Sequence, residues 1–179
     1  MSEQFKLQIA EAQQSYLTKY NINSNLLQSA KYIFVSHNTP FLNYFSQTAT
    51  LPGVSTNPVL APTPYSETWR HGDKMDFQEL TITALIDEDL RVFEETYNWL
   101  KGLTYPHNGS EYEKQKRSGL YADMDLLFLT NSATDNLSIR FTNCHPIALG
   151  SLTMSSMDSP VSVITCDFTF RYDTFEIRR

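Results

Sequence analysis

The chain has 179 residues, 41% of them hydrophobic, which suffices for one domain with a packed core and an appendage. Its net charge of −6 argues against a surface built to grip DNA or RNA, because such surfaces need clustered Lys and Arg. DNA that passes nearby without being gripped is compatible with this charge. The amino end shows no secretion signal, and no apolar run approaches the ~20 residues that span a bilayer. We therefore expect a soluble protein made in a reducing cytoplasm.

The amino-terminal segment predicts an amphipathic helix over residues 3–20, followed by a linker at 21–25. Its apolar residues recur at near-helical spacing and are Phe5, Ile9, Ala12, Tyr16 and Tyr20. Two interpretations stay open: a helix docked on the outside of the domain, or an arm that reaches a neighbouring subunit. The predicted organisation is a helical arm and linker at 1–30 and a β-rich domain at 31–179.

The β-rich domain is predicted from alternating apolar and polar residues. The alternation predicts strands within residues 31–37, 43–51, 77–86, 120–129, 137–143 and 161–172. These strands, mostly antiparallel, surround one helix in a sandwich or barrel. The fold class is therefore mainly β with one core helix, an α+β domain that also carries the amino-terminal helix.

Residues 52–73 interrupt this pattern with four prolines and two glycines. We expect a long loop, and loops of this length without structure of their own are usually functional or disordered. Tyr65 and Trp69 argue against simple disorder, since large aromatic side chains normally pack against something.

Three acids, Asp87, Glu88 and Asp89, stand where the strand at 77–86 gives way to the predicted helix. Adjacent residues at a helix start point in different directions, which disfavours a catalytic pair sharing one cleft. We expect Asp87 to be the N-cap, with Glu88 and Asp89 in the first turn. Gly102 marks the expected helix end. The expected apolar stripe of this helix is Leu90, Phe93, Tyr97 and Leu100.

Residues with catalytic or ligand-binding chemistry are scattered. Cys144 and Cys166 lie in apolar runs without a CxxC pair, which favours buried free thiols over zinc or redox chemistry. The four histidines lack metal-site spacing, and GxSxG, GxGxxG and P-loop motifs are missing. We therefore predict no catalytic residue, metal or cofactor.

Asp123 and Asp125 share one face of a predicted strand with Tyr121. The simpler interpretation is an ordinary solvated face. The functional interpretation is a face that stays wet and negative inside an assembly.

The order of these elements resembles the tail-tube proteins of contractile-tailed bacteriophages, over roughly residues 31–177. The stretches that carry the resemblance are "NTPFLNYFSQTATLPGVS", "PYSETWRHGDKMDFQELTITALIDEDLRVFEETYNWLKGL", "GLYADMDLLFLTNSATDNLSIRFTNCHPIALGSL" and "VSVITCDFTFRYDTFEI". They contain a Leu-Pro-Gly, an Arg-x-Gly-Asp, an Asp-Glu-Asp-Leu helix start with Trp-Leu at its end, and a closing Phe-x-Phe-x-Tyr strand.

The resemblance implies a structural virion protein, not an enzyme. In that family, hexameric rings stack head to tail into a tube, with sheath, baseplate and tape-measure proteins as partners and no membrane. Double-stranded DNA leaves through the channel without specific binding. For this chain it implies a ring-stacking role for residues 52–73, with Pro52, Gly53, Tyr65, Trp69 and Arg70 as candidate residues.

The resemblance also gives Asp123 and Asp125 a candidate role, because acids that line such a channel would repel DNA phosphates. Two alternatives remain open: a baseplate ring of the same fold that initiates the tube, and, more distantly, a β-sandwich hydrolase or ligand-binding module. Copy number per virion separates the repeating tube subunit from the initiator.

Overall fold

The computed structural model describes residues 26–155 and 163–179. The predicted helix at 3–20 and linker at 21–25 lie outside the described residues. The helices are α2 (Pro40–Phe45), α3 (Arg91–Thr104) and α4 (Gly109–Ser118). The strands are β1 (Tyr32–Ser36), β2 (Ser46–Thr50), β3 (Val54–Thr56), β4 (Val59–Pro62), β5 (Glu67–Arg70), β6 (Met75–Phe77), β7 (Leu80–Leu85), β8 (Ala122–Leu129), β9 (Asp135–Leu149), β10 (Thr165–Arg171) and β11 (Thr174–Arg178).

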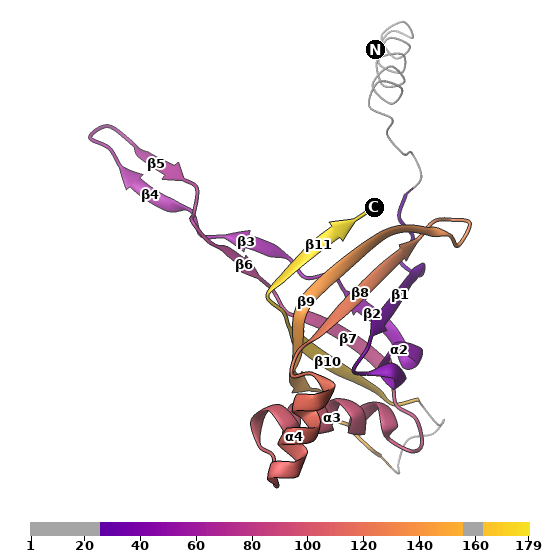
Figure 1. Ribbon diagram of the computed structural model, residues 1–179. Coiled ribbons are helices and arrows are strands. Elements are labelled where there is room, and N and C mark those ends of the chain that lie inside the picture. Colours follow the sequence, from indigo (N-terminus) through magenta and orange to yellow (C-terminus); the bar gives the residue numbers. More distant parts are fainter. Residues whose placement is uncertain (1–25, 156–162) are drawn as a thin grey trace, which may run out of the picture.

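Seven strands form one curved antiparallel sheet in the order β1-β8-β9-β10-β7-β2, with β11 also paired to β9. The long strand β9 joins its two halves (Figure 1). Residues 138–142 of β9 pair with β11, whereas residues 145–149 pair with β10. Asn143 stands between these segments with a φ of 56°, a left-handed conformation that asparagine tolerates better than most residues. The bend turns the sheet back on itself and creates an interior.

The core lies between the two halves and confirms the predicted alternation. Leu80, Ile82 and Ala84 of β7 are buried, while the residues between them are partly exposed. The remaining core strands follow the same rule, with buried Ala122, Met124, Leu126, Ile139, Phe141, Cys144, Cys166, Phe168 and Phe170. The mainly β fold with one core helix is therefore confirmed.

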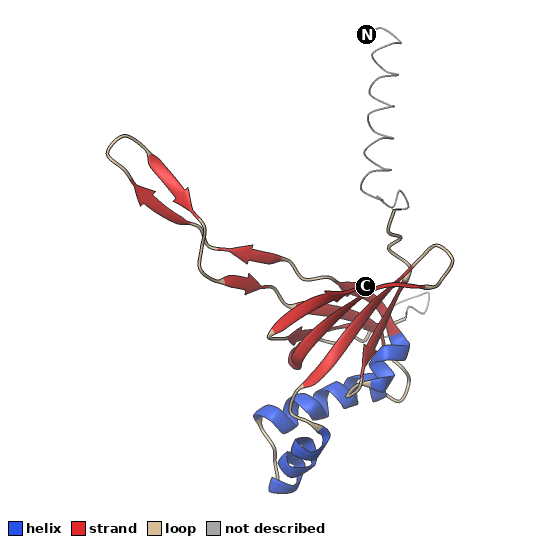
Figure 2. Cartoon of the chain, turned by 45° about the horizontal axis from the view of Figure 1, so that its top comes forward, coloured by secondary structure: helices blue, strands red, loops and turns tan. Residues whose placement is uncertain are grey.

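Helix α3 packs across one end of the sheet, next to α4 (Figure 2). Its Trp99 ring contacts Phe170, and the indole N–H donates to the carbonyl of Leu120 at 3.1 Å. The predicted apolar stripe is wrong, because the buried residues of α3 are Val92, Thr96, Trp99 and Gly102.

The end of α3 and the segment after it also differ from the prediction. Gly102 lies inside the helix, which continues to Thr104, so it is not the stop. Residues 109–118, where no helix was predicted, form α4, which ends before Gly119 at φ 99°.

Residues 52–73 are not a structureless loop. They form most of a β-hairpin arm, in which β3 pairs with β6 near the barrel and β4 pairs with β5 farther out. Figures 1 and 2 show this arm projecting away from the barrel. The prolines do not prevent pairing, because each strand is short and belongs to a two-stranded ribbon with free edges.

Candidate functional site

The distal part of the arm exposes large apolar side chains. Tyr65, in the turn between β4 and β5, is 100% exposed, and Trp69 on β5 is 67% exposed. Leu60 stands directly opposite Trp69 across the hairpin, so both lie on the same face. A two-stranded hairpin of this size is marginal in water by itself. Exposed apolar side chains gathered in this way are typical of a surface that another molecule covers.

The base of the arm is held by tight backbone contacts. Pro52 is buried there, and the carbonyl of Gly53 accepts a hydrogen bond from the N–H of Gln78 at 3.0 Å. Farther out, a Cβ on Gly72 would come within 2.3 Å of the carbonyl oxygen of Asn57, so only glycine fits. The predicted stacking residues thus separate into a base, Pro52 and Gly53, and an exposed distal part, with Tyr65, Trp69 and Arg70.

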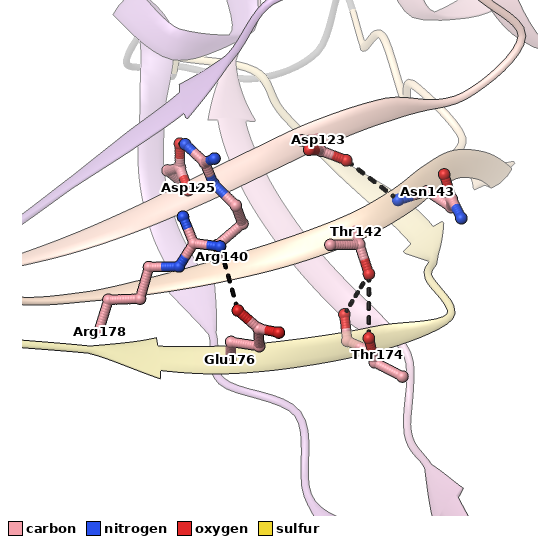
Figure 3. Close-up of polar contacts among 8 residues, drawn as sticks. All are labelled: Asp123, Asp125, Arg140, Thr142, Asn143, Thr174, Glu176 and Arg178. Atoms are coloured by element: carbon pink, nitrogen blue, oxygen red, sulfur yellow. Dashed lines mark hydrogen bonds and ion pairs between the residues drawn. The ribbon is translucent and has the colours of Figure 1, made fainter.

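The predicted acidic face of β8 is charge-compensated. Asp125 accepts two hydrogen bonds from the guanidinium of Arg140, at 2.8 and 2.9 Å, across the β8–β9 register. This contact raises the pKa of Arg140 above its ordinary value, mainly through the hydrogen bond and the charge of Asp125. On the next strand, Glu176 stands opposite Arg140 and pairs with Arg178 at 3.0 Å (Figure 3).

Asp123, on β8, contacts the bend of β9. Its carboxylate accepts the backbone N–H of Asn143 at 3.3 Å (Figure 3). The Asn143 side chain donates to Asp173 at 2.7 Å. Beside them, the hydroxyls of Thr142 and Thr174 lie 3.0 Å apart. Asp123 and Asp125 thus share a face as predicted, but each is engaged by the fold, and the sequence did not show these partners.

A second polar face covers the other half of the sheet. Its outward residues are mostly threonines: Thr48 and Thr50 on β2, Thr81 and Thr83 on β7, and Thr165 and Thr169 on β10. Thr83 donates to Asp167 at 2.6 Å. At the end of this face, Arg171 pairs with Glu79 at 3.2 Å.

The acidic junction before α3 has a different geometry from the prediction. The N-cap position is Leu90, at φ 56°, and Glu88 and Asp89 lie in the turn before it. The reason is local: a turn closed by the Leu90 N–H on the Asp87 carbonyl at 3.0 Å delays the helix start. The Asp87 carboxylate still accepts a helix N–H, that of Val92, at 3.3 Å. Asp89 pairs with Arg91 at 3.0 Å.

The two thiols are free and buried, as predicted. Burial raises the pKa of Cys144 to about 12 and also raises that of Cys166, so neither is a ready nucleophile. Within residues 26–155 and 163–179, no group of three or more His, Cys, Asp or Glu side chains is arranged to hold a metal ion. None of the helices in these same ranges is long and apolar enough to cross a membrane.

Comparison with solved structures defines the class of this fold. A chain of the anti-feeding prophage baseplate, described as 6-fold symmetrised, superimposes with a TM-score of 0.63 at 10% identity, covering 88% of this chain and 97% of that one. A chain of an extracellular contractile injection system sheath–tube complex gives 0.60 at 10% identity, covering 90% and 96%. At such identities the likeness establishes the fold alone, that of contractile injection-system components.

The family follows from the sequence. A family model described as phage tail tube protein matches residues 1–178, so the chain belongs to the phage tail tube protein family. The match includes the first 30 residues, which the resemblance noted above did not cover. A search of curated proteins found no match. The chain is thus a structural, non-enzymatic component of the tail-tube type, and the hydrolase alternative is wrong.

Proposed function

We propose that this protein forms hexameric rings that stack into the inner tube of a contractile phage tail, through which double-stranded DNA leaves. The family assignment supports a virion tail component. The similar structures belong to a sheath–tube complex and to a 6-fold symmetrised baseplate. The proposed partners are copies of the chain, the sheath, the baseplate and the tape-measure protein.

The arm carries this proposal. In the described chain, β4 and β5 pair only with each other, and Leu60, Tyr65 and Trp69 remain open to solvent. A monomer gains nothing from holding such side chains away from its core. If the arm lies against the next ring of a stacked tube, the same side chains are buried in every ring except the last. We therefore assign the distal arm to contacts between rings.

A baseplate ring that initiates the tube remains a second candidate, because a baseplate chain is among the similar structures. Both candidates use the same fold and the same arm, so copy number per virion distinguishes them. Hundreds of copies support the repeating tube subunit, and one or two rings support the initiator.

Electron microscopy of the purified protein tests the assembly. The informative variant replaces residues 58–71 with a short turn, because Asn57 and Gly72 already lie in contact at the waist of the arm. We expect the intact protein to form tubes and the shortened one to remain folded by circular dichroism without stacking. Tubes of normal length from the shortened variant would show that the distal arm does not join the rings.

A further inference from the structure

The threonines of the second polar face form aligned rows across neighbouring strands. Thr50, Thr81 and Thr169 stand opposite one another on β2, β7 and β10, and Ala148 of β9 continues the row. In the adjacent row, Thr83 on β7 stands between Thr48 on β2 and Asp167 on β10. We call this surface, residues 48, 50, 81, 83, 148, 165, 167 and 169, the threonine face.

The chemistry of the threonine face is uniform. Its threonine side chains are short and β-branched, which keeps them close to the sheet and leaves a surface of hydroxyl and methyl groups. Half-buried Leu85, opposite Thr165, is the larger apolar residue beside them. Asp167 is its one charged residue. Arg171, two residues beyond Thr169 on β10, stands at the end of this face and is paired with Glu79.

The face of the other half-sheet, formed by β1, β8, β9 and β11, has a different composition. It presents Arg140 and Arg178, which pair with Asp125 and Glu176. It also presents apolar Ile33, which is 46% exposed, and Leu127. Arginine is enriched at surfaces that contact other proteins, whereas threonine is under-represented at the energetic centres of interfaces. The two faces are therefore not equivalent candidates for the wall of a channel.

We propose that the threonine face, rather than the face bearing Asp123 and Asp125, lines the channel, an inference that rests on the tube function proposed above. DNA phosphates sliding along this wall would meet hydroxyls and water without an unpaired cation to hold them. Sixfold symmetry would repeat Asp167 as a ring of carboxylates, and the low-dielectric wall would strengthen its repulsion of phosphate. The arginine-bearing face then turns away from the DNA, toward protein partners.

Cysteine labelling of assembled tubes tests the assignment. The two native thiols are buried, so wild-type tubes give the background. Thr81→Cys places a thiol on the threonine face, and Ser138→Cys places one at a similarly half-buried position on the other face. Each variant is treated, as intact tubes and as dissociated subunits, with a small maleimide and with the same maleimide on a polyethylene glycol too bulky to enter the channel.

We expect Thr81→Cys to react with both reagents in subunits, but to lose labelling by the bulky reagent in tubes while still reacting with the small one. Ser138→Cys should not show this combination. The same loss at Ser138→Cys, or bulky labelling of Thr81→Cys in tubes, would overturn the assignment in favour of the face bearing Asp125. If Thr81→Cys does not assemble, Thr169→Cys on β10 replaces it. Failure of the wild-type protein to form tubes would contradict the proposed function itself.

Discussion

Removing the Trp69 side chain should weaken tube assembly without weakening the subunit. A tryptophan side chain can bury up to about 250 Å². With Trp69 67% exposed in the subunit, roughly 170 Å² remains to be covered on assembly. At about 25 cal/mol per Å², complete burial would contribute about 4 kcal/mol for each contact.

This value is an upper limit, because association also orders the arm and immobilises side chains, at about 0.5–1.5 kcal/mol each. A net contribution of about 3 kcal/mol corresponds to roughly a hundredfold in affinity, since each 1.4 kcal/mol is tenfold. Trp69→Ser should therefore raise the lowest protein concentration at which tubes form by about that factor. Sedimentation of tubes over a concentration series measures it directly.

Two controls separate assembly from folding. Because Trp69 is mostly exposed in the subunit, its replacement should change the free energy of unfolding by no more than about 0.5 kcal/mol in urea. Trp69→Phe keeps most of the apolar surface, so its critical concentration should fall between those of wild type and Trp69→Ser. An unchanged critical concentration for Trp69→Ser would refute the assignment of this face of the arm to ring contacts.

Three further predictions concern the subunit. Asp87→Ala should cost about 1 kcal/mol in urea unfolding, because it removes a carboxylate that accepts a helix N–H. The free energy of unfolding should fall as pH rises from 9 toward 12. Burial raises the pKa of Cys144 from 9.0 to about 12 and that of Tyr172 from 10.0 to about 12. In this pH range both groups lose their protons more readily in the unfolded chain, which favours unfolding. Tyr172→Phe should reduce this alkaline loss, and an identical pH profile would contradict it. Asp125→Lys should lower Tm in thermal unfolding more than Asp125→Asn, because it places a second cation beside Arg140.

The barrel strands could be predicted because each packs one face against the core. In β7, burial alternates strictly from Leu80 to Leu85, and apolar and polar residues alternate in the sequence in the same way up to Ala84. The arm has no such pattern, since all four residues of β5 are exposed. Its pairing depends on the turn between β4 and β5 and on close contact at Gly72, neither of which leaves a period in the sequence.

The helices were harder to predict from the sequence, because they too lack a clear apolar repeat. Helix α3 buries Thr96 and Gly102, residues whose polarity and small size hide the stripe that actually faces the core. Helix α4 is polar throughout, so no apolar repeat distinguishes it from a loop. At the start of α3, Leu90 adopts a left-handed conformation, which the residue type leucine does not predict. Of the three acids before it, Asp87 accepts a helix N–H, from a position three residues before the N-cap.

The proposed channel wall illustrates what alternation cannot provide. A period of two identifies Asp125 as facing away from the core, but not that Arg140, on the following strand, will stand opposite and neutralise it. That pairing follows from register, which the hairpin between β8 and β9 and the bend at Asn143 determine together. Within the described residues, Asp167 on the threonine face has a neutral side-chain partner, the hydroxyl of Thr83, so it keeps its negative charge without a neighbouring cation. A wall that must not hold DNA can be built from residues that carry little charge. Acids such as Asp125 suit it less well, because the fold places an arginine beside them.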